Sequence, residues 1–128
     1  MKQLILAGLV CLLAIPCIFG QGKKRVDPCA NAQTQAEMTQ CAEREYKAAD
    51  VALNQVYRQL VAMLDDEEKA QLKEAQTAWL KYRDTNCEFV ADQYKGGTMR
   101  PMIFGYCLAE VTSNRTAELK SQIQDRKN

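Results

Sequence analysis

An apolar stripe between residues 42 and 63 restricts the fold of this chain more than any other feature. Its members recur at spacings of three and four residues: Ala42, Tyr46, Ala49, Leu53, Val56, Leu60 and Met63. No glycine or proline interrupts the stripe, and charged residues such as Glu43 and Arg58 fall outside it. This period predicts one amphipathic helix of about seven turns. Thr34 and Glu37 have the spacing of a capping box, which predicts that the helix begins there.

A second helix is predicted after the acidic run 65–68. Carboxylates are stabilised by the positive end of a helix dipole, so this run is interpreted as a cap and first turn. It lacks the ligand spacing of an EF-hand, the competing metal interpretation. The helix is predicted to run to about Tyr94. Its expected buried face contains Leu72, Ala75, Trp79, Tyr82, Asn86 and either Phe89 or Val90.

The segment 95–101 contains Gly96 and Gly97 and is the one strong helix breaker inside the domain. A third helix is predicted from Pro101 or Met102, because proline is tolerated in a first turn. It is expected to bury Phe104, Leu108, Val111, Leu119 and Ile123 and to fray over 124–128. No strand-like alternation is present. The predicted fold class is therefore all-α, a disulfide-stapled three-helix bundle.

The N-terminus has the pattern of a signal peptide. Lys2 precedes the apolar run 4–15, which is too short for a comfortable membrane span. Cleavage is expected after Gly20 or Gly22, which predicts export to the periplasm or medium with no membrane insertion afterwards. The alternatives are a retained anchor and lipidation at Cys11 or Cys17, although neither cysteine follows a small residue. The expected organisation is a signal peptide at 1–20, an N-terminal segment at 21–33 and a helical domain at 34–127.

Four cysteines remain after cleavage: Cys29, Cys41, Cys87 and Cys107. An even number in a small exported domain indicates disulfides, with three possible pairings. In an antiparallel hairpin, Cys87 and Cys107 lie about two turns on either side of the glycine loop. Cys29 precedes the first helix and can fold back onto Cys41. We therefore favour Cys29–Cys41 with Cys87–Cys107.

Several function classes are disfavoured by composition. Of 17 basic and 16 acidic residues, loss of Lys2 leaves 16 of each. A neutral domain has no overall positive electrostatic field that would attract nucleic acid. The chain has no histidine, and oxidised cysteines leave no thiol nucleophile. There is no CxxC motif and no phosphate-binding loop. We expect no catalytic residues, metal or cofactor, and hence a protein that is not an enzyme.

Gln76, Trp79, Arg83 and Cys87 share roughly one helical face. The favoured interpretation is structural: Trp79 fills the core and Arg83 is a strut paired with a carboxylate. The alternative makes Arg83 a ligand contact. The structural motif as a whole comprises Gln76, Trp79, Tyr82, Arg83, Asp84 and Arg115.

This motif belongs to a longer pattern. Its other members are Thr34-Gln35-Ala36-Glu37-Met38, Cys41-Ala42, Glu45-Tyr46, Asp50, Leu53-Asn54, Tyr57, Leu72, Ala75, Cys87, Cys107, Thr112 and Leu119. From Cys29 to Leu119 the chain resembles the LprI-type lysozyme-inhibitor domain. The resemblance implies a helical, disulfide-bonded, exported protein that binds and inhibits lysozyme. The founding type is lipidated, whereas this signal segment lacks a convincing lipidation motif.

Lysozyme works with two carboxylates in a cleft, so an inhibitor can insert a projecting segment whose donors engage those acids. The best candidate comprises Lys95, Gly96, Gly97, Thr98, Met99 and Arg100. Its glycines permit close backbone approach, and its cations offer charge-assisted hydrogen bonds. The competing interpretation is an ordinary helix connection. The acidic run 65–68 is a second possible surface for a basic lysozyme. The alternative function is a non-catalytic interaction module of the cell envelope, and the oligomeric state stays open.

Overall fold

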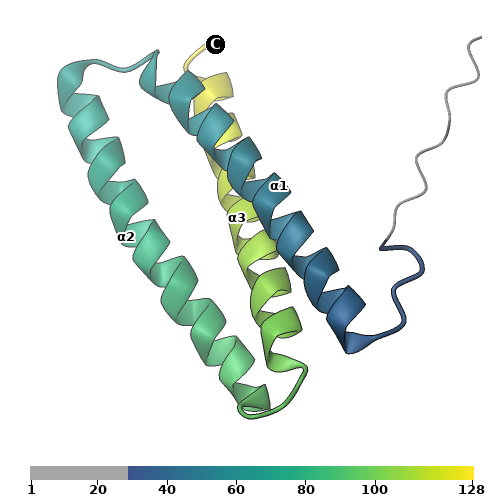
Figure 1. Cartoon of the computed structure of the whole chain (residues 1–128). Helices are drawn as coiled ribbons and strands as arrows, with labels where there is room; N and C mark the ends of the chain where they lie inside the picture. The colour runs from purple at the N-terminus through teal and green to yellow at the C-terminus, as the bar shows by residue number, and fades with distance from the viewer. Residues whose placement is uncertain (1–28) are drawn as a thin grey trace, which may run out of the picture.

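The computed structural model describes residues 29–128, which form three long helices (Figure 1). They are α1 (Gln35–Val61), α2 (Asp66–Ala91) and α3 (Arg100–Asp125), and the short 3₁₀ helix η1 (Asp92–Tyr94) extends α2. No strand occurs in this part of the chain. The all-α, three-helix prediction is thus confirmed. The expected signal peptide and its cleavage sites lie outside the described residues.

The helices run up, down and up, so that α1 and α3 are parallel neighbours and α2 is antiparallel to both (Figure 1). Most interhelical packing joins α1 to α3, and α2 packs chiefly against α3. The α1–α3 pair is therefore the main body. In the described residues, no helix is both long enough and apolar enough to span a bilayer.

Reciprocal hydrogen bonds start the first two helices. The Glu37 amide donates to Thr34 Oγ1 at 3.2 Å, and Glu37 Oε2 accepts from the Thr34 amide at 3.0 Å. Asp65 and Glu68 repeat this arrangement at 2.9 and 3.1 Å. Each box satisfies amides that a helix start leaves without partners. The acidic run begins α2 as the sequence predicts.

The main core lies toward the upper ends of α1 and α3 in Figure 1. Its buried members are Leu53, Val56, Leu60, Leu64, Leu72, Leu119 and Ile123. At the opposite end, Gly105 of α3 lies directly against α1: a Cβ built at Gly105 would stand 2.9 Å from the Cβ of Ala42. The absent side chain of Gly105 lets the two helices approach closely there.

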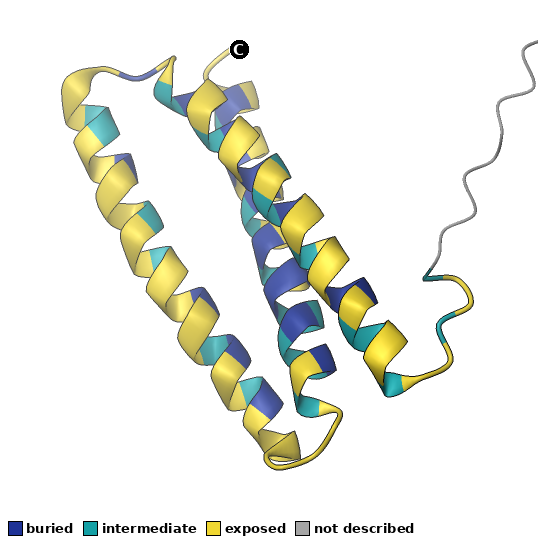
Figure 2. Cartoon of the chain, viewed as in Figure 1, coloured by how far each residue is buried: buried dark blue, intermediate teal, exposed yellow. Residues whose placement is uncertain are grey.

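Burial follows the predicted pattern on α1 but departs from it on α2 (Figure 2). Met63 is 40% exposed, because α1 ends at Val61 and the turn inserts Leu64 into the core instead. On α2, Ala75 is exposed, as are Tyr82 at 58% and Phe89 at 76%. The prediction that Met63, Ala75 and Tyr82 are buried was wrong. Of the two alternatives Phe89 and Val90, Phe89 is exposed and Val90 is half-buried.

The physical reason on α2 is its rotation about its own axis. The buried residues of this helix are Leu72, Arg83, Cys87 and Ala91. Cys87 is bonded to Cys107 of α3, so the face that contains Cys87 must point inward. Side chains on a helix are separated by about 100° per residue, which turns Tyr82 and Phe89 away from the body.

Both favoured disulfides are present. The Cα atoms are 5.6 Å apart in Cys29–Cys41 and 5.5 Å apart in Cys87–Cys107, within the usual range for a bridge. The first ties the segment before α1 back onto that helix, where Arg44 Nη2 donates to the sulfurs of Cys29 and Cys41 at 2.8 and 3.0 Å. The second joins α2 to α3.

Candidate functional site

The loop between η1 and α3 forms one end of the molecule (Figure 1). Residues 95–99 are all exposed. The Gly97 amide donates to the Tyr94 carbonyl at 2.9 Å, which closes a tight turn. Gly96 has φ +82°, a left-handed conformation that L side chains rarely adopt. The glycine pair therefore shapes the loop and also leaves its backbone open to an approaching surface.

Arg100 holds the base of this loop. Its Nε and Nη2 atoms donate to Asp92 Oδ1 at 3.0 and 2.8 Å, and Nη2 also forms an ion pair with Glu88. These bonds, the one to Asp92 first, raise the pKa of the Arg100 guanidinium above its usual value. The guanidinium carbon also lies 6.0 Å from the centre of the Phe104 ring. Arg100 thus links the start of α3 to the end of α2.

This arrangement separates the two cations of the predicted segment. Arg100 is engaged within the molecule, whereas Lys95 has no ion-pair partner among residues 29–128. The predictions from sequence missed Glu88 and Asp92 as partners of Arg100. Their signal was available, since two acids four residues apart near a helix end are placed to receive a cation from the returning helix.

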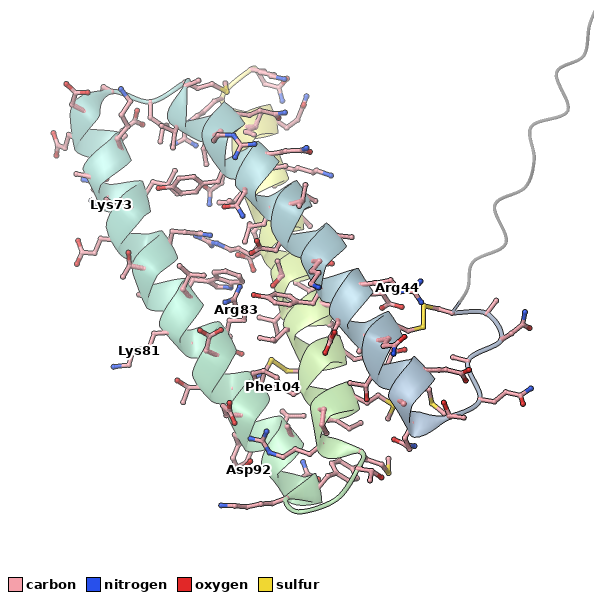
Figure 3. The ribbon with its side chains drawn as sticks, in the orientation of Figure 1. Arg44, Lys73, Lys81, Arg83, Asp92 and Phe104 are labelled. Carbon is pink, nitrogen blue, oxygen red and sulfur yellow. A yellow bond between two sulfur atoms is a disulfide. The ribbon has the colours of Figure 1, made fainter. Side chains whose placement is uncertain are left out.

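The hairpin below the loop is cross-linked. Cys87 and Ala91 have no exposed surface, and the Cys87–Cys107 bridge joins the two helices near the Phe104 label in Figure 3. A loop on a bridged hairpin loses less conformational entropy on binding than one on separate helices.

Arg83 occupies the space between α2 and α1 (Figure 3). It is 7% exposed, and its guanidinium carbon lies 5.4 Å from the ring centres of both Tyr46 and Trp79. Its Nε donates to Asp84 at 2.8 Å, while Nη1 stands 3.9 Å from Asp50 of α1. A guanidinium between two rings contributes cation–π attraction as well as contact area.

The rest of the sequence motif divides between two faces. Arg115 of α3 donates to Gln76 Oε1 at 3.1 Å and lies 6.0 Å from the Trp79 ring centre. Tyr82 is exposed on the outer side of α2. Gln76, Trp79, Arg83 and Arg115 therefore form one interhelical layer, which Tyr82 does not join. Within residues 29–128, no group of three or more metal-ligating side chains converges.

The acidic run at the opposite end of α2 is partly neutralised. Asp66 pairs with Lys69 at 3.2 Å, and Glu68 faces Arg126, the residue directly after α3, at 3.5 Å. Asp65 is occupied as the cap of α2. The glycine loop at the other end of the helix is thus the more open of the two surfaces that the sequence suggests.

Comparison with known proteins identifies the family. The model of the family described as Lysozyme inhibitor LprI matches residues 27–119. A protein of Rhizobium meliloti (strain 1021), described as uncharacterized, is 36% identical over 130 residues, covering 91% of this chain and 94% of the relative. No solved structure matches the chain. The match covers α1, α2, both disulfides and α3 as far as Leu119, so this chain belongs to the LprI lysozyme-inhibitor family.

Proposed function

We propose that this chain is exported, binds lysozyme and inhibits it by covering the active-site cleft. The observation that carries this proposal is the family match over residues 27–119. Two disulfides within 100 described residues support an oxidising compartment. An inhibitor has no need of catalytic groups, which agrees with the chemistry expected from a chain without histidine.

In this proposal the loop 95–99 enters the cleft. Lys95 offers an ammonium to the two carboxylates that lysozyme uses. Gly96 and Gly97 allow the loop backbone to lie close to the cleft wall. Arg100 acts as a positioning residue. Its bonds to Asp92 and Glu88 hold the base of the loop in place, so its guanidinium does not contact the partner.

Stoichiometric inhibition of peptidoglycan lysis tests the proposal. The purified protein, with both disulfides formed, is titrated against c-, g- and i-type lysozymes. Lys95→Ala should raise the inhibition constant about tenfold or more and leave the melting temperature unchanged. Lys120→Ala is the matched control, since Lys120 is exposed on α3 away from the loop, and it should inhibit like the parent.

Arg100→Ala should weaken inhibition and also mobilise the loop, which hydrogen exchange at residues 95–100 would detect. Absence of inhibition of all three lysozyme types at about 10 µM protein would contradict the proposal. Recovery of a different envelope protein under those conditions would favour the non-catalytic interaction module instead.

A further inference from the structure

The outer side of α2 presents a second apolar stripe that the three-helix body leaves uncovered. Its members are Ala75, Ala78, Tyr82, Thr85 and Phe89, and all of them are exposed. Phe89, at 76%, has the highest exposed fraction among the large hydrophobic side chains of the described residues. Shallow hollows along this side are lined by Ala78, Lys81, Tyr82 and Phe89. A continuous apolar stripe, unlike one scattered residue, indicates an interaction surface.

The spacing of the stripe is that of a helix–helix seam. Its residues follow one another at intervals of three, four, three and four, the period with which two helices interlock side chains. Large and small side chains occupy different positions: Tyr82 and Phe89 project, whereas Ala75 and Ala78 are small. The Thr85 hydroxyl donates to the Lys81 carbonyl at 2.7 Å within the helix, so its methyl group can serve as an apolar contact.

Charges along one edge of the stripe alternate in sign. Glu74, Lys81 and Glu88 recur every seven residues beside it. Lys81 has no ion-pair partner within residues 29–128. Glu88 and Asp92 share the single guanidinium of Arg100, which leaves one net negative charge at that end. The edge therefore offers an unpaired cation and an excess anion seven residues apart.

We propose that this stripe binds the same stripe of a second copy, with the two α2 helices antiparallel about a two-fold axis near residues 83 and 84. In this register Tyr82 packs against Thr85 of the second copy, and Phe89 packs against Ala78 of the second copy. Each large side chain meets a small one. Lys81 then faces Glu88 of the second copy, and symmetry makes this pair twice.

A parallel in-register arrangement fits less well, because it would place Phe89 against Phe89 and would put Lys81 and Glu88 of the two copies on opposite edges of the seam. The antiparallel seam also lies on a different side of α2 from Arg83 and Cys87, which face the body. The two bodies therefore remain separate. The loop 95–99 stays outside the seam, so the dimer does not depend on the proposed inhibition of lysozyme.

Sedimentation equilibrium tests the proposal on the purified, disulfide-bonded protein. One helix pair buries less surface than a permanent interface, so we expect reversible association with a dissociation constant on the order of 10 µM. Phe89→Glu should weaken the dimer by about tenfold or more. Its far-ultraviolet circular dichroism and melting temperature in dilute solution should match the parent, because Phe89 is exposed in the monomer.

Charge reversal tests the antiparallel register. Lys81→Glu should weaken self-association by placing like charges together, and Lys120→Glu, a change at an exposed lysine of α3, should not. Glu88→Lys should likewise weaken self-association. A mixture of the Lys81→Glu and Glu88→Lys proteins should form a heterodimer, since both cross pairs then join opposite charges.

A sedimentation mass that stays at the monomer value up to about 1 mM protein would overturn the proposal. So would a dimer that Phe89→Glu leaves intact, or a mixture of the two charge variants that does not associate. A monomeric protein whose lysozyme inhibition is lost in Phe89→Glu would assign the stripe to the lysozyme interface, and the dimer proposal would again be wrong.

Discussion

Individual polar side chains do much of the packing in this small protein. Thr112 and Thr116 of α3 are buried, and the Thr116 hydroxyl donates to the Thr112 carbonyl at 3.0 Å. Arg83 takes a place between α1 and α2 that a hydrocarbon side chain would fill in a larger core, stacked on Tyr46 and Trp79. Its long stem and flat head give it contact area, so truncation would remove packing as well as charge.

Gly105→Ala should destabilise the fold by up to about 2 kcal/mol. Alanine favours a helix by about 1 kcal/mol over glycine, but overpacking typically costs about 1–3 kcal/mol. The new Cβ would lie 2.9 Å from the Ala42 Cβ and 3.3 Å from the Ala42 carbonyl carbon. A backbone atom cannot swing aside, so the clash should outweigh the propensity gain. Urea unfolding measures the change.

The control for this prediction is Ala42→Gly combined with Gly105→Ala, which moves the small residue to the other helix. It should recover part of the loss, because the closest contact, Cβ to Cβ, is removed. A Gly105→Ala protein that is more stable than the parent would show that α1 and α3 are not in close contact there.

The three helices begin by different means. α1 and α2 each start with a reciprocal side-chain cap. α3 has no side-chain cap bond, and Pro101 lies in its first turn. Its start is held instead by the Arg100 ion pairs and, two turns on, by Cys107. Local hydrogen bonds thus define two helix starts, and tertiary contacts define the third.

Stability in acid should depend on Glu37. Hydrogen bonds from the backbone amides of Gln33 and Thr34 lower the pKa of its carboxyl group. A lowered pKa in the folded state means that the unfolded chain takes up the proton first. The stabilisation of the fold by the Glu37 carboxylate is therefore present above the ordinary glutamate pKa of about 4.3. It is lost as pH falls through the lower pKa of the folded state.

Glu37→Gln should reduce the loss of stability at low pH, because glutamine can accept the same hydrogen bonds but does not titrate. Melting temperatures are compared between about pH 7 and pH 3. Glu43→Gln, an exposed change in the same helix outside the cap, should keep the parent's dependence. The same fall in melting temperature at low pH for Glu37→Gln and the parent would contradict the prediction.

The molecule as a whole is a two-helix body with a third helix attached to it. α2 is held near its start by Leu72 in the core, at mid-length by the layer of Trp79, Arg83 and Arg115, and near its end by the Cys87–Cys107 bridge. Figure 2 shows how little of α2 is buried compared with α3. The bridge should therefore matter more for α2 than apolar burial does.

Cys87→Ala with Cys107→Ala should lower the free energy of unfolding by about 3 kcal/mol, as expected for release of a loop of 20 residues. Hydrogen exchange should rise most in the second half of α2 and in the loop 95–99. Cys29→Ala with Cys41→Ala is the matched comparison. It should cost less in global unfolding, because that bridge ties only the segment before α1. Equal losses from the two pairs would contradict this account.

The sequence by itself determined what depends on neighbours along the chain. Helical period, the Thr34 and Asp65 caps, the breaker at Gly96 and the hairpin pairing of Cys87 with Cys107 are all local patterns, and the structure contains each of them. The family resemblance likewise follows from residue spacing. The loop 95–100 as a partner site stays a proposal.

Only the tertiary structure decided which face of α2 is buried. The sequence of α2 supports two overlapping stripes, one through Leu72 and Trp79 and one through Ala75, Tyr82 and Phe89. Both satisfy a period of about 3.6 residues, so periodicity cannot rank them. The bridge to Cys107 and the stacking of Arg83 turn the stripe through Leu72 and Trp79 toward the other two helices. Those contacts join residues far apart in the chain, which is why they could not be read from α2 alone.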